Sequence, residues 1–324
     1  MGIKNFSKLL NDYAPNLIKE LDISTYKNKY IAVDTSLILY KYISGIRNSG
    51  KDITVNNKSV SHIFAIINKT INLLEEDIIP IYVFDGKAPE IKNKTLINRR
   101  KVKENAKNNQ ELSKTKEDKI KYFKRSLYIT TEQYNECKEI LTIMGIPYIQ
   151  AEGEADCVCA QLIKKNLVYS VYSEDMDMLT FGCTKLSKKI IFKKNKKLIN
   201  EIDLNELLCK LQLDYDQFIN LCVLLGCDYI NNIKGIGYKT SYKIIREYKS
   251  ISNFIEKNKK YTIPINYNYK NIIEYYKNPP KTKLNSNYKI KKPNLNKLNK
   301  ILIENKFSKK NINKIIYILT HASI

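Results

Sequence analysis

Short apolar runs that each end at carboxylates constrain the fold of this chain more than any other feature. Four such runs occur, at residues 30–33, 79–84, 145–149 and 168–172. The acids that follow them are Asp34, Asp85, Glu152, Glu154, Asp156, Glu174, Asp175 and Asp177. Runs of this length and apolar content are typical of buried parallel strands.

Helical patterns separate these runs. Residues 60–76, 130–144 and 154–166 are predicted helices, and Thr130 with Gln133 reads as a capping box. Alternation of strands and helices predicts an α/β fold with a mostly parallel central sheet flanked by helices. Ligands of such sheets bind beyond the carboxyl ends of the strands. A single Asp there could serve a turn, but acids after four strands predict a site at that edge.

The charge of the chain points to a polyanionic partner. Lys and Arg number 56 against 33 Asp and Glu, which gives a net charge of +23. Nucleic acid is the partner that this excess favours. An anionic membrane surface is the rival, but the chain has no Trp and no helix that is basic on one face and rich in Phe or Leu on the other. We find no signal peptide and no apolar run of about 18 residues, so we expect no membrane partner.

The metal-binding residues that we expect are acids. The seven cysteines form no Cys-x-x-Cys pair, and His62 and His321 lie far apart, so we expect reduced buried thiols and no zinc site. The acidic candidates are Asp34, Asp85, Glu154, Asp156, Asp175, Asp177 and Asp228. Carboxylates gathered at one edge repel one another unless cations neutralise them. Mg²⁺ prefers oxygen ligands, and two such ions can assist cleavage of a phosphodiester.

Seven short blocks across about residues 1–250 carry a resemblance to a known family. They are Met1–Ile3, Ala32–Asp34, Val83–Lys87, Met144–Tyr148, Glu174–Gly182, Leu224–Tyr229 and Ile233–Gly237. In sequence and order these blocks resemble the flap endonucleases of the xeroderma pigmentosum G family of 5′ nucleases. The resemblance implies a PIN-like 5′ nuclease fold and structure-specific cleavage of DNA at 5′ flaps in replication and repair. It implies that the seven acids bind two Mg²⁺ ions, with Mn²⁺ as a substitute.

The resemblance also implies roles for basic and aromatic residues. Lys92 and Arg99 match the pair that approaches the scissile phosphate from the base of a helical arch. Residues 87–125, with fourteen Lys and Arg against five Asp and Glu, would form that arch, although a solvated helical face is the alternative. Tyr40 matches a ring that stacks on a terminal base, and Gly2 matches a glycine near the active site.

Residues 216–225 and 239–248 are predicted helices that flank Gly235 and Gly237. They resemble the helix–two-turn–helix of the family, which holds a monovalent cation, normally K⁺. Arg47 and Lys239 complete the predicted DNA-contacting residues.

Three features depart from the family pattern. Asp156 stands where Glu is usual, and Glu152 adds an acid that we interpret as solvated or as supporting a metal ligand. No sliding-clamp motif follows residue 250, so we expect no clamp binding by that route. We expect a monomer in which residues 1–105 and 106–255 form one catalytic core and residues 256–324 a basic extension with one final helix. The expected location is inside the cell, nuclear for a cellular protein or in the host cell for a viral one.

Two alternatives stay open at this point. One is a 5′–3′ exonuclease or a junction- or bubble-cutting nuclease of the same superfamily. The other is a non-catalytic DNA-binding protein, although all seven acidic positions remain acidic.

Overall fold

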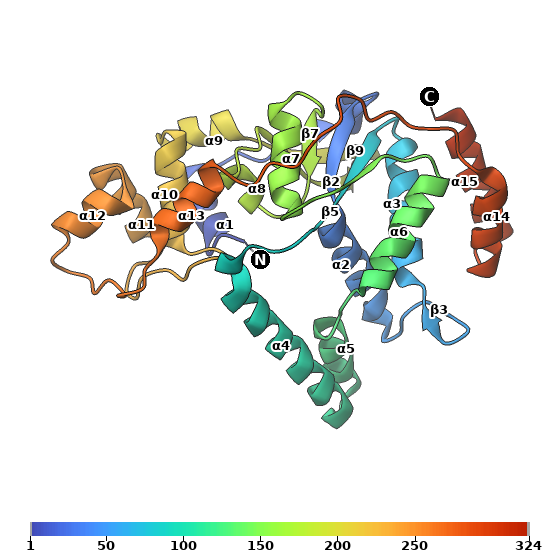
Figure 1. The fold of residues 1–324 in the computed structure, drawn as a ribbon, viewed down its shortest axis with the longest axis horizontal. Coiled ribbons are helices and arrows are strands. Elements are labelled where there is room, and N and C mark those ends of the chain that lie inside the picture. Colours follow the sequence, from blue (N-terminus) through green and yellow to red (C-terminus); the bar gives the residue numbers. More distant parts are fainter. Residues whose placement is uncertain (1, 323–324) are drawn as a thin grey trace. The chain divides into compact units, whose positions relative to one another are not determined.

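The computed structural model describes residues 2–322, and its elements confirm the α/β class (Figure 1). The chain forms two compact units from non-contiguous segments. The first unit comprises Met1–Ile23, Gly86–Thr95 and Ala151–Lys283, and the second comprises Ser24–Asp85, Leu96–Gln150 and Leu284–Ile324. Each of the sequence regions 1–105, 106–255 and 256–324 therefore contributes to both units.

Three parallel strands form the centre of the second unit. β2 (Tyr30–Asp34), β5 (Ile79–Phe84) and β6 (Tyr148–Gln150) pair in the order β2-β5-β6. Helices bury them, so that Ile31 and Val83 are fully inaccessible. The helices of this unit are α2 (Thr35–Ile46), α3 (Ser61–Leu74), α6 (Thr131–Ile143), α14 (Leu295–Glu304) and α15 (Lys309–His321), with short elements η1 (Ile23–Tyr26), η2 (Arg47–Ser49), β3 (Thr54–Val55) and β4 (Lys58–Ser59).

The expected capping box of Thr130 and Gln133 is present and begins α6. The helix ends before Gly145, whose φ of +74° lies in the left-handed region that favours glycine. There the Lys291 N–H donates to the Gly145 carbonyl at 2.8 Å, so the C-terminal segment crosses the end of α6. Beyond this crossing, Phe307 stacks on Phe64 of α3 with ring centroids 4.0 Å apart.

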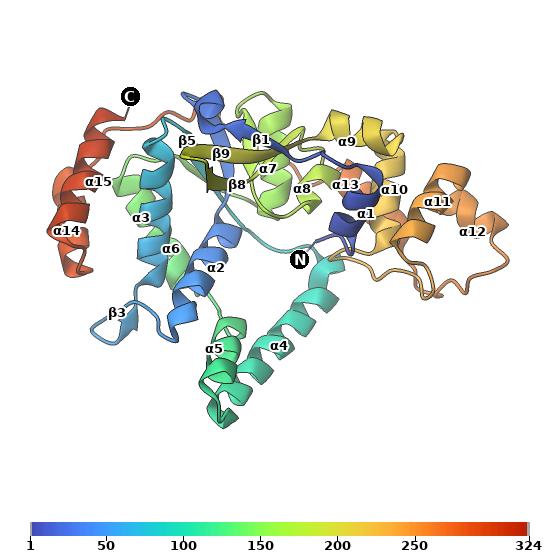
Figure 2. The ribbon, with the colours of Figure 1, turned by 180° about the vertical axis from the view of Figure 1, so that it is seen from behind.

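The first unit contains a hairpin that the sequence did not predict. β8 (Lys185–Lys193) and β9 (Lys196–Asp203) pair antiparallel, and β1 (Lys19–Asp22) joins the far side of β9 (Figure 2). β7 (Ser170–Tyr172) pairs with β8 in parallel. Lysines at exposed positions of both strands mask the apolar alternation of the hairpin; they are Lys189, Lys193, Lys196 and Lys197. The helices of this unit are α1 (Phe6–Tyr13), α7 (Ala155–Lys164), α8 (Asp177–Thr180), α9 (Leu204–Leu211), α10 (Tyr215–Leu225), α11 (Tyr238–Tyr248), α12 (Ile251–Lys257) and α13 (Tyr269–Lys277).

The expectation of an irregular extension with one final helix was wrong. Residues 256–324 contain α13, α14 and α15. Asn and Lys dilute the apolar periodicity of this region, yet Ile272 and Tyr276 of α13 are buried one turn apart. The helix depends on this contact with the rest of its unit and not on a strong local pattern.

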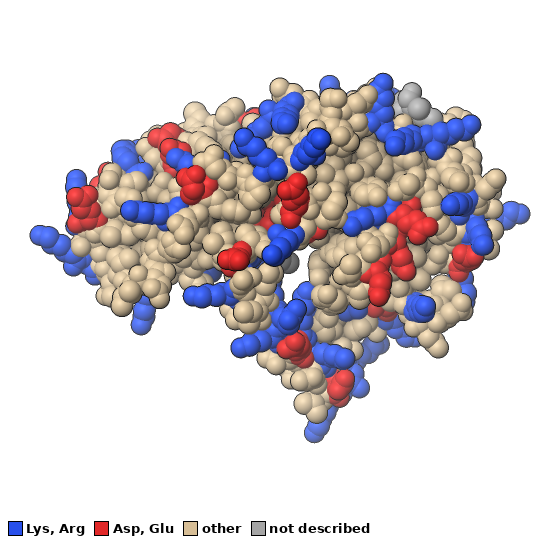
Figure 3. Space-filling view, in the orientation of Figure 1, with Lys and Arg blue, Asp and Glu red and all other residues tan. Residues whose placement is uncertain are grey.

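The basic segment 87–125 is helical, as predicted. It consists of η3 (Glu90–Lys92), α4 (Asn93–Leu112) and α5 (Lys116–Arg125). Ala106 is the buried residue of α4, and Lys and Arg side chains are prominent over the part of the surface that α4 and α5 occupy (Figure 3). A helix with so little buried surface gains little from packing, which is consistent with a role outside the core. Within residues 2–322, no helix is long and apolar enough to cross a bilayer.

Candidate functional site

Two acids follow β7 in the first unit and are fixed by a tight turn. The Ser173 hydroxyl accepts from the Asp175 N–H at 3.1 Å, and Asp175 Oδ1 accepts from the Asp177 N–H at 3.1 Å. α8 begins at Asp177, which is 3% exposed. Its Oδ1 is buried and has no hydrogen-bond partner in the part of the chain that the structure describes. A buried carboxylate oxygen without a donor is costly, so this position favours a cation.

The pKa shifts of Asp175 and Asp177 also favour a cation at this position. Burial raises the pKa of Asp177 well above its usual value, and the nearby Asp175 and Asp228 raise it further. Burial also raises the pKa of Asp175, with Asp228 adding to the effect. The fold therefore holds three like-charged groups together at a cost that a positive ion would relieve.

Glu154 accepts hydrogen bonds from three side chains. It occupies the N-cap position of α7, but its side chain makes no capping bond. Instead Oε1 accepts from Lys92 Nζ, and Oε2 accepts from the Tyr229 hydroxyl at 2.6 Å and the Tyr275 hydroxyl at 2.9 Å. Glu154 is 4% exposed, and these donors compensate the burial of its charge.

Lys92 supplies the positive charge of the cluster. Besides Glu154, its Nζ lies 3.5 Å from Asp228 Oδ2. Burial by itself would lower the pKa of Lys92, but the carboxylates of Glu154, Asp156 and Asp228 prevail and raise it. Lys92 therefore remains protonated and neutralises part of the acidic charge.

Backbone contacts explain how Lys92 reaches the acids. The Gly86 N–H donates to the Gly153 carbonyl at 2.6 Å, and the Lys87 N–H donates to the backbone carbonyl of Glu152 at 3.0 Å. A Cβ at Gly86 would collide with the backbone of this same loop, so the approach requires glycine. Past Lys92, the Thr95 hydroxyl donates to the Asp228 carbonyl at 2.5 Å.

Gly2 lies against the two acids that follow β7. Its φ is +86°, and a Cβ at this position would stand 2.9 Å from Asp177 Oδ1 and still closer to Asp175. Only glycine fits this position without displacing a carboxylate. Asp156 lies in the first turn of α7 and is half-buried, whereas Glu152 is exposed, in keeping with the interpretation of Glu152 as solvated.

No three His, Cys, Asp or Glu side chains converge closely enough to coordinate one ion as they stand in residues 2–322. In the first unit, the ammonium group of Lys92 lies among the carboxylates. All seven cysteines are free, six of them buried and Cys209 exposed, so the expectation of buried thiols was wrong for Cys209.

The second unit carries Asp34 and Asp85 at the ends of adjacent strands. Asp34 is 7% exposed and caps α2, with Oδ1 accepting from the Leu37 N–H at 3.1 Å. Asp85 is exposed, and its Oδ2 accepts from the Ser36 hydroxyl at 2.5 Å. The Tyr134 hydroxyl lies 3.0 Å from the same Ser36 oxygen. This unit therefore presents its own pair of oriented carboxylates.

Tyr40 and the basic residues of the second unit have partners of their own. Lys103 Nζ donates to the Tyr40 hydroxyl at 3.1 Å and lies 4.7 Å from the centre of its ring. Arg99, on α4, is half-buried. Arg47 donates to both Asp52 oxygens at 3.0 and 2.9 Å, and to the Phe123 carbonyl at 2.8 Å. Arg47 therefore ties α5 to the end of α2 in this structure, and its predicted DNA contact stays a prediction.

The glycine turn lies between α10 and α11, which fall where helices were predicted. Gly235 has a φ of +83°, and Gly237 is the N-cap of α11 without a side-chain cap. The first N–H groups of α11 thus lack a capping side chain, an arrangement that suits a phosphate. Lys239 is largely exposed and lies 3.3 Å from Asp12 Oδ2.

Sequence reasoning assigned no role to three residues that contact the acids, Ser36, Tyr229 and Tyr275. It also assigned none to Tyr134, which contacts Ser36. Tyr229 follows Asp228 directly and Ser36 lies two positions after Asp34, which was an available signal. Tyr134 and Tyr275 lie far along the chain from their partners Ser36 and Glu154, and no local pattern marks them.

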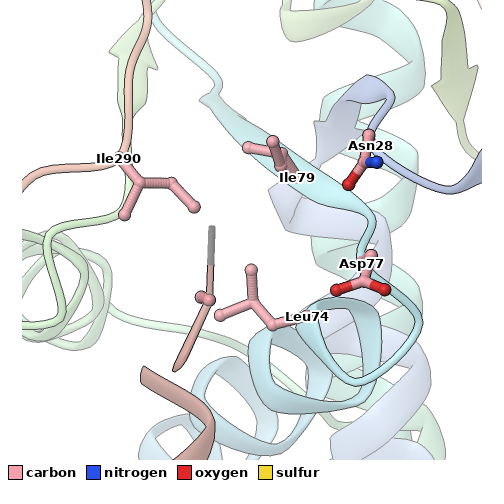
Figure 4. Close-up of a pocket in the computed structure, with 6 residues that line it drawn as sticks. Asn28, Leu74, Asp77, Ile79 and Ile290 are labelled. Carbon is pink, nitrogen blue, oxygen red and sulfur yellow. The ribbon is translucent and has the colours of Figure 1, made fainter. Parts of the chain in front are cut away.

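A pocket in the second unit is not lined by Asp34 or Asp85. Asn28, Leu74, Asp77, Ile79, Ile290 and Ala322 line it (Figure 4). Ile79 is the first residue of β5, whereas Asp85 follows the last. The pocket is too small for a ligand larger than about one water molecule, and it contributes nothing to the site.

Comparison with known proteins identifies a family. The XPG N-terminal domain matches residues 1–106, and the XPG I-region matches residues 145–228. Flap endonuclease 1 of Nematostella vectensis is 41% identical over 288 residues, covering 86% of this chain and 76% of that protein. Flap endonuclease-1 of Methanococcus jannaschii superposes with a TM-score of 0.72 at 30% identity, covering 97% of this chain and 99% of that one. The catalytic core of Rad2 in complex with a DNA substrate shares the fold, with a TM-score of 0.75 at 24% identity and coverage of 98% and 100%.

Proposed function

Because this chain belongs to the flap endonucleases of the XPG family, we propose that it cuts DNA at junctions between single and double strands. The reaction is hydrolysis of a phosphodiester at the base of a 5′ flap, as part of DNA replication and repair. The substrate is recognised by its shape and its phosphates, with little reading of bases.

One observation carries the metal-dependent part of this proposal. Asp177 presents a buried Oδ1 without a hydrogen-bond donor, beside Asp175 and Asp228. An all-oxygen donor set under this much repulsion fits Mg²⁺ better than a soft transition metal. The residues of this chain therefore fit the group that the family implies.

We assign seven acids to two Mg²⁺ ions, with Mn²⁺ as a substitute. They are Asp34, Asp85, Glu154, Asp156, Asp175, Asp177 and Asp228. When bound, such ions activate a water molecule and stabilise the attacking and leaving oxygens of the phosphodiester. Asp156 is one methylene shorter than Glu, which favours contact with a metal through water.

Lys92 has two roles in this proposal. Without DNA and metal, it neutralises Glu154 and Asp228. With a substrate in place, the same ammonium group can turn to the scissile phosphate and stabilise its developing charge together with Arg99. The exchange leaves Glu154 Oε1 available as a ligand.

The remaining DNA contacts come from residues that the structure leaves partly exposed or without caps. Tyr40 supplies an aromatic face for the terminal base. The N–H groups at the start of α11, beside Gly235 and Gly237, contact a phosphate, and Lys239 adds positive charge. The helix–two-turn–helix that contains this turn holds a K⁺ ion, as the family resemblance implies. Arg47 contributes once its bonds to Asp52 and Phe123 are exchanged.

Cleavage of a labelled double-flap DNA tests the proposal directly. We expect Mg²⁺-dependent cutting at the flap base that EDTA abolishes and Mn²⁺ restores. Nicked, bubble and four-way substrates run in parallel distinguish a flap enzyme from the 5′–3′ exonuclease or junction-cutting alternatives. Binding of the flap without cleavage under all metal conditions would favour a non-catalytic DNA-binding protein.

We also propose that the protein acts as a monomer, without binding a sliding clamp through a tail motif. It would work in the nucleus of its cell, or in the host cell for a viral protein. Light scattering of the free protein and a clamp-capture assay test the first two statements.

A further inference from the structure

The two carboxylate oxygens of Glu154 have different hydrogen-bond donors. Oε2 accepts from both Tyr229 and Tyr275, while Oε1 accepts from Lys92. A carboxylate oxygen has about two lone-pair positions, so Oε2 is saturated and Oε1 is not. Lys92 is a mobile ammonium group on a flexible stem, whereas both phenols are attached to rigid rings.

Packing of α13 fixes the position of the Tyr275 hydroxyl. Ile272 and Tyr276 are buried and anchor the helix, and Lys277 pairs with Asp216 of α10 at 2.7 Å. The Tyr275 ring meets Tyr229 edge-on, with centroids 5.4 Å apart.

The surroundings of the ring complete its orientation. Phe181 makes a second edge-on contact with Tyr275 at 5.8 Å. The Cys157 thiol lies 3.5 Å from the hydroxyl. Since the Tyr275 proton is directed at Glu154, the thiol can donate to the phenol oxygen and continue the chain of hydrogen bonds.

We propose that Tyr275 is a positioning residue for Glu154: together with Tyr229 it holds Oε2, so that Glu154 offers Oε1 alone to a metal ion that displaces Lys92. This inference rests on the proposed function and assigns the C-terminal helix α13 a part in the metal site.

The physical reason lies in the flexibility of the Glu side chain. A free Glu must lose rotamer freedom to bind a metal, and with both oxygens available it can chelate or pair with Lys92 in several ways. Two donors on one oxygen remove these alternatives before the metal arrives. Hydrogen-bond partners of metal ligands typically change metal affinity or activity by about 10- to 100-fold when they are removed.

Tyr275→Phe is the test, because it keeps the ring contacts and deletes the hydroxyl alone. Tyr267→Phe is the matched control: Tyr267 is a buried tyrosine of the same unit whose hydroxyl has no hydrogen-bond partner in residues 2–322. Mn²⁺ binding to the DNA-free proteins is measured by electron paramagnetic resonance. The part of the binding that Asp177→Asn removes defines the site.

We expect Tyr275→Phe to weaken this Asp177-dependent Mn²⁺ binding by about tenfold or more, and Tyr267→Phe to leave it unchanged. The Mg²⁺ concentration that half-saturates single-turnover cleavage should rise in parallel, and excess Mg²⁺ should restore the rate. A purely structural role for Tyr275 would give neither the shift nor the rescue.

Wild-type Mn²⁺ affinity in Tyr275→Phe would overturn the inference and leave the proposed nuclease intact, provided that the wild-type protein cuts the flap. Absence of both Asp177-dependent Mn²⁺ binding and cleavage in the wild-type protein would overturn the proposed function, and this inference with it.

Discussion

Asp177 stands out at the scale of single residues because its environment opposes its charge. Its Oδ1 is buried without a donor, next to Asp175 and Asp228. Asp177→Asn keeps the shape and removes the repulsion. We expect single-turnover cleavage to fall by several orders of magnitude while flap binding is retained, because metal stabilisation dominates phosphoryl transfer. We also expect the melting temperature of the metal-free protein to rise by a few degrees, which corresponds to an increase of roughly 1 kcal/mol in the free energy of unfolding.

Calorimetry of both proteins in EDTA, and quenched-flow cleavage in Mg²⁺, measure the two effects. Cleavage above about a tenth of the wild-type rate would remove Asp177 from the metal ligands. A lower melting temperature in EDTA would mean that the carboxylate is stabilised by its surroundings after all.

His62 gives a second residue-scale prediction, away from the acids. It is 1% exposed, and its Nε2 lies 2.5 Å from Glu136 Oε2. Burial lowers the pKa of His62, and this outweighs the opposing effect of Glu136. The folded protein therefore favours the neutral ring, whereas the unfolded chain keeps a pKa of about 6.5. The stability that comes from keeping His62 neutral is fully present above about pH 6.5. It is lost as the pH falls through that value toward the pKa of His62 in the folded protein.

Urea unfolding between about pH 7.5 and 5.5 measures this loss of stability. We expect His62→Gln to show a smaller decrease than the wild-type protein, and His321→Gln, at an exposed position, to match the wild type. A decrease in His62→Gln as steep as that of the wild type would show that other groups cause it.

At the scale of elements, α4 provides matched neighbours for testing the basic arch. Arg99 is half-buried and Arg100 is exposed. We expect Arg99→Ala to slow single-turnover cleavage by about 100-fold without changing the melting temperature, since it removes charge from the transition state. Arg100→Ala should change neither quantity. If the arch is only a solvated face, the two variants will be indistinguishable.

Lys92 differs from Arg99 because it also contacts the acids of the metal-free protein. Lys92→Ala should slow cleavage similarly, and it should also lower the melting temperature in EDTA, since Glu154 and Asp228 lose their cation. The double variant with Arg99→Ala should be non-additive in rate, because both groups act on one phosphate. Lys114→Ala and Lys116→Ala should mainly weaken flap capture, an effect that salt partly masks. Full additivity would place Lys92 and Arg99 in separate steps.

At the scale of the whole molecule, a charge of +23 predicts strong dependence of DNA binding on salt. If 6 to 10 phosphates are contacted, affinity should fall by roughly 10³ to 10⁵ between about 50 and 200 mM salt. Fluorescence anisotropy with a labelled flap, in Ca²⁺ to prevent cleavage, measures the slope. A nearly flat response would contradict binding through phosphates, even if the acids proved catalytic.

The sequence determined the features that depend on local patterns. Apolar runs and periods predicted β2, β5, α3 and α6, and the structure confirms these elements. The strand predictions were accurate because burial on two faces requires a continuous apolar run, whatever the partner. The acids after the strands predicted a metal site, which stays a prediction. The β8–β9 hairpin escaped prediction because its exposed lysines hide its alternation.

The tertiary structure alone decided which distant side chains meet. Lys92 and Tyr275 contact Glu154 from 62 and 121 positions away along the chain. A hydrogen bond needs two groups within about 3 Å, and sequence spacing carries no such information when the groups belong to different elements. The packing of α13 and the glycine approach at Gly86 bring these groups together. Only the folded chain therefore shows that Lys92 contacts one oxygen of Glu154 while Tyr229 and Tyr275 contact the other.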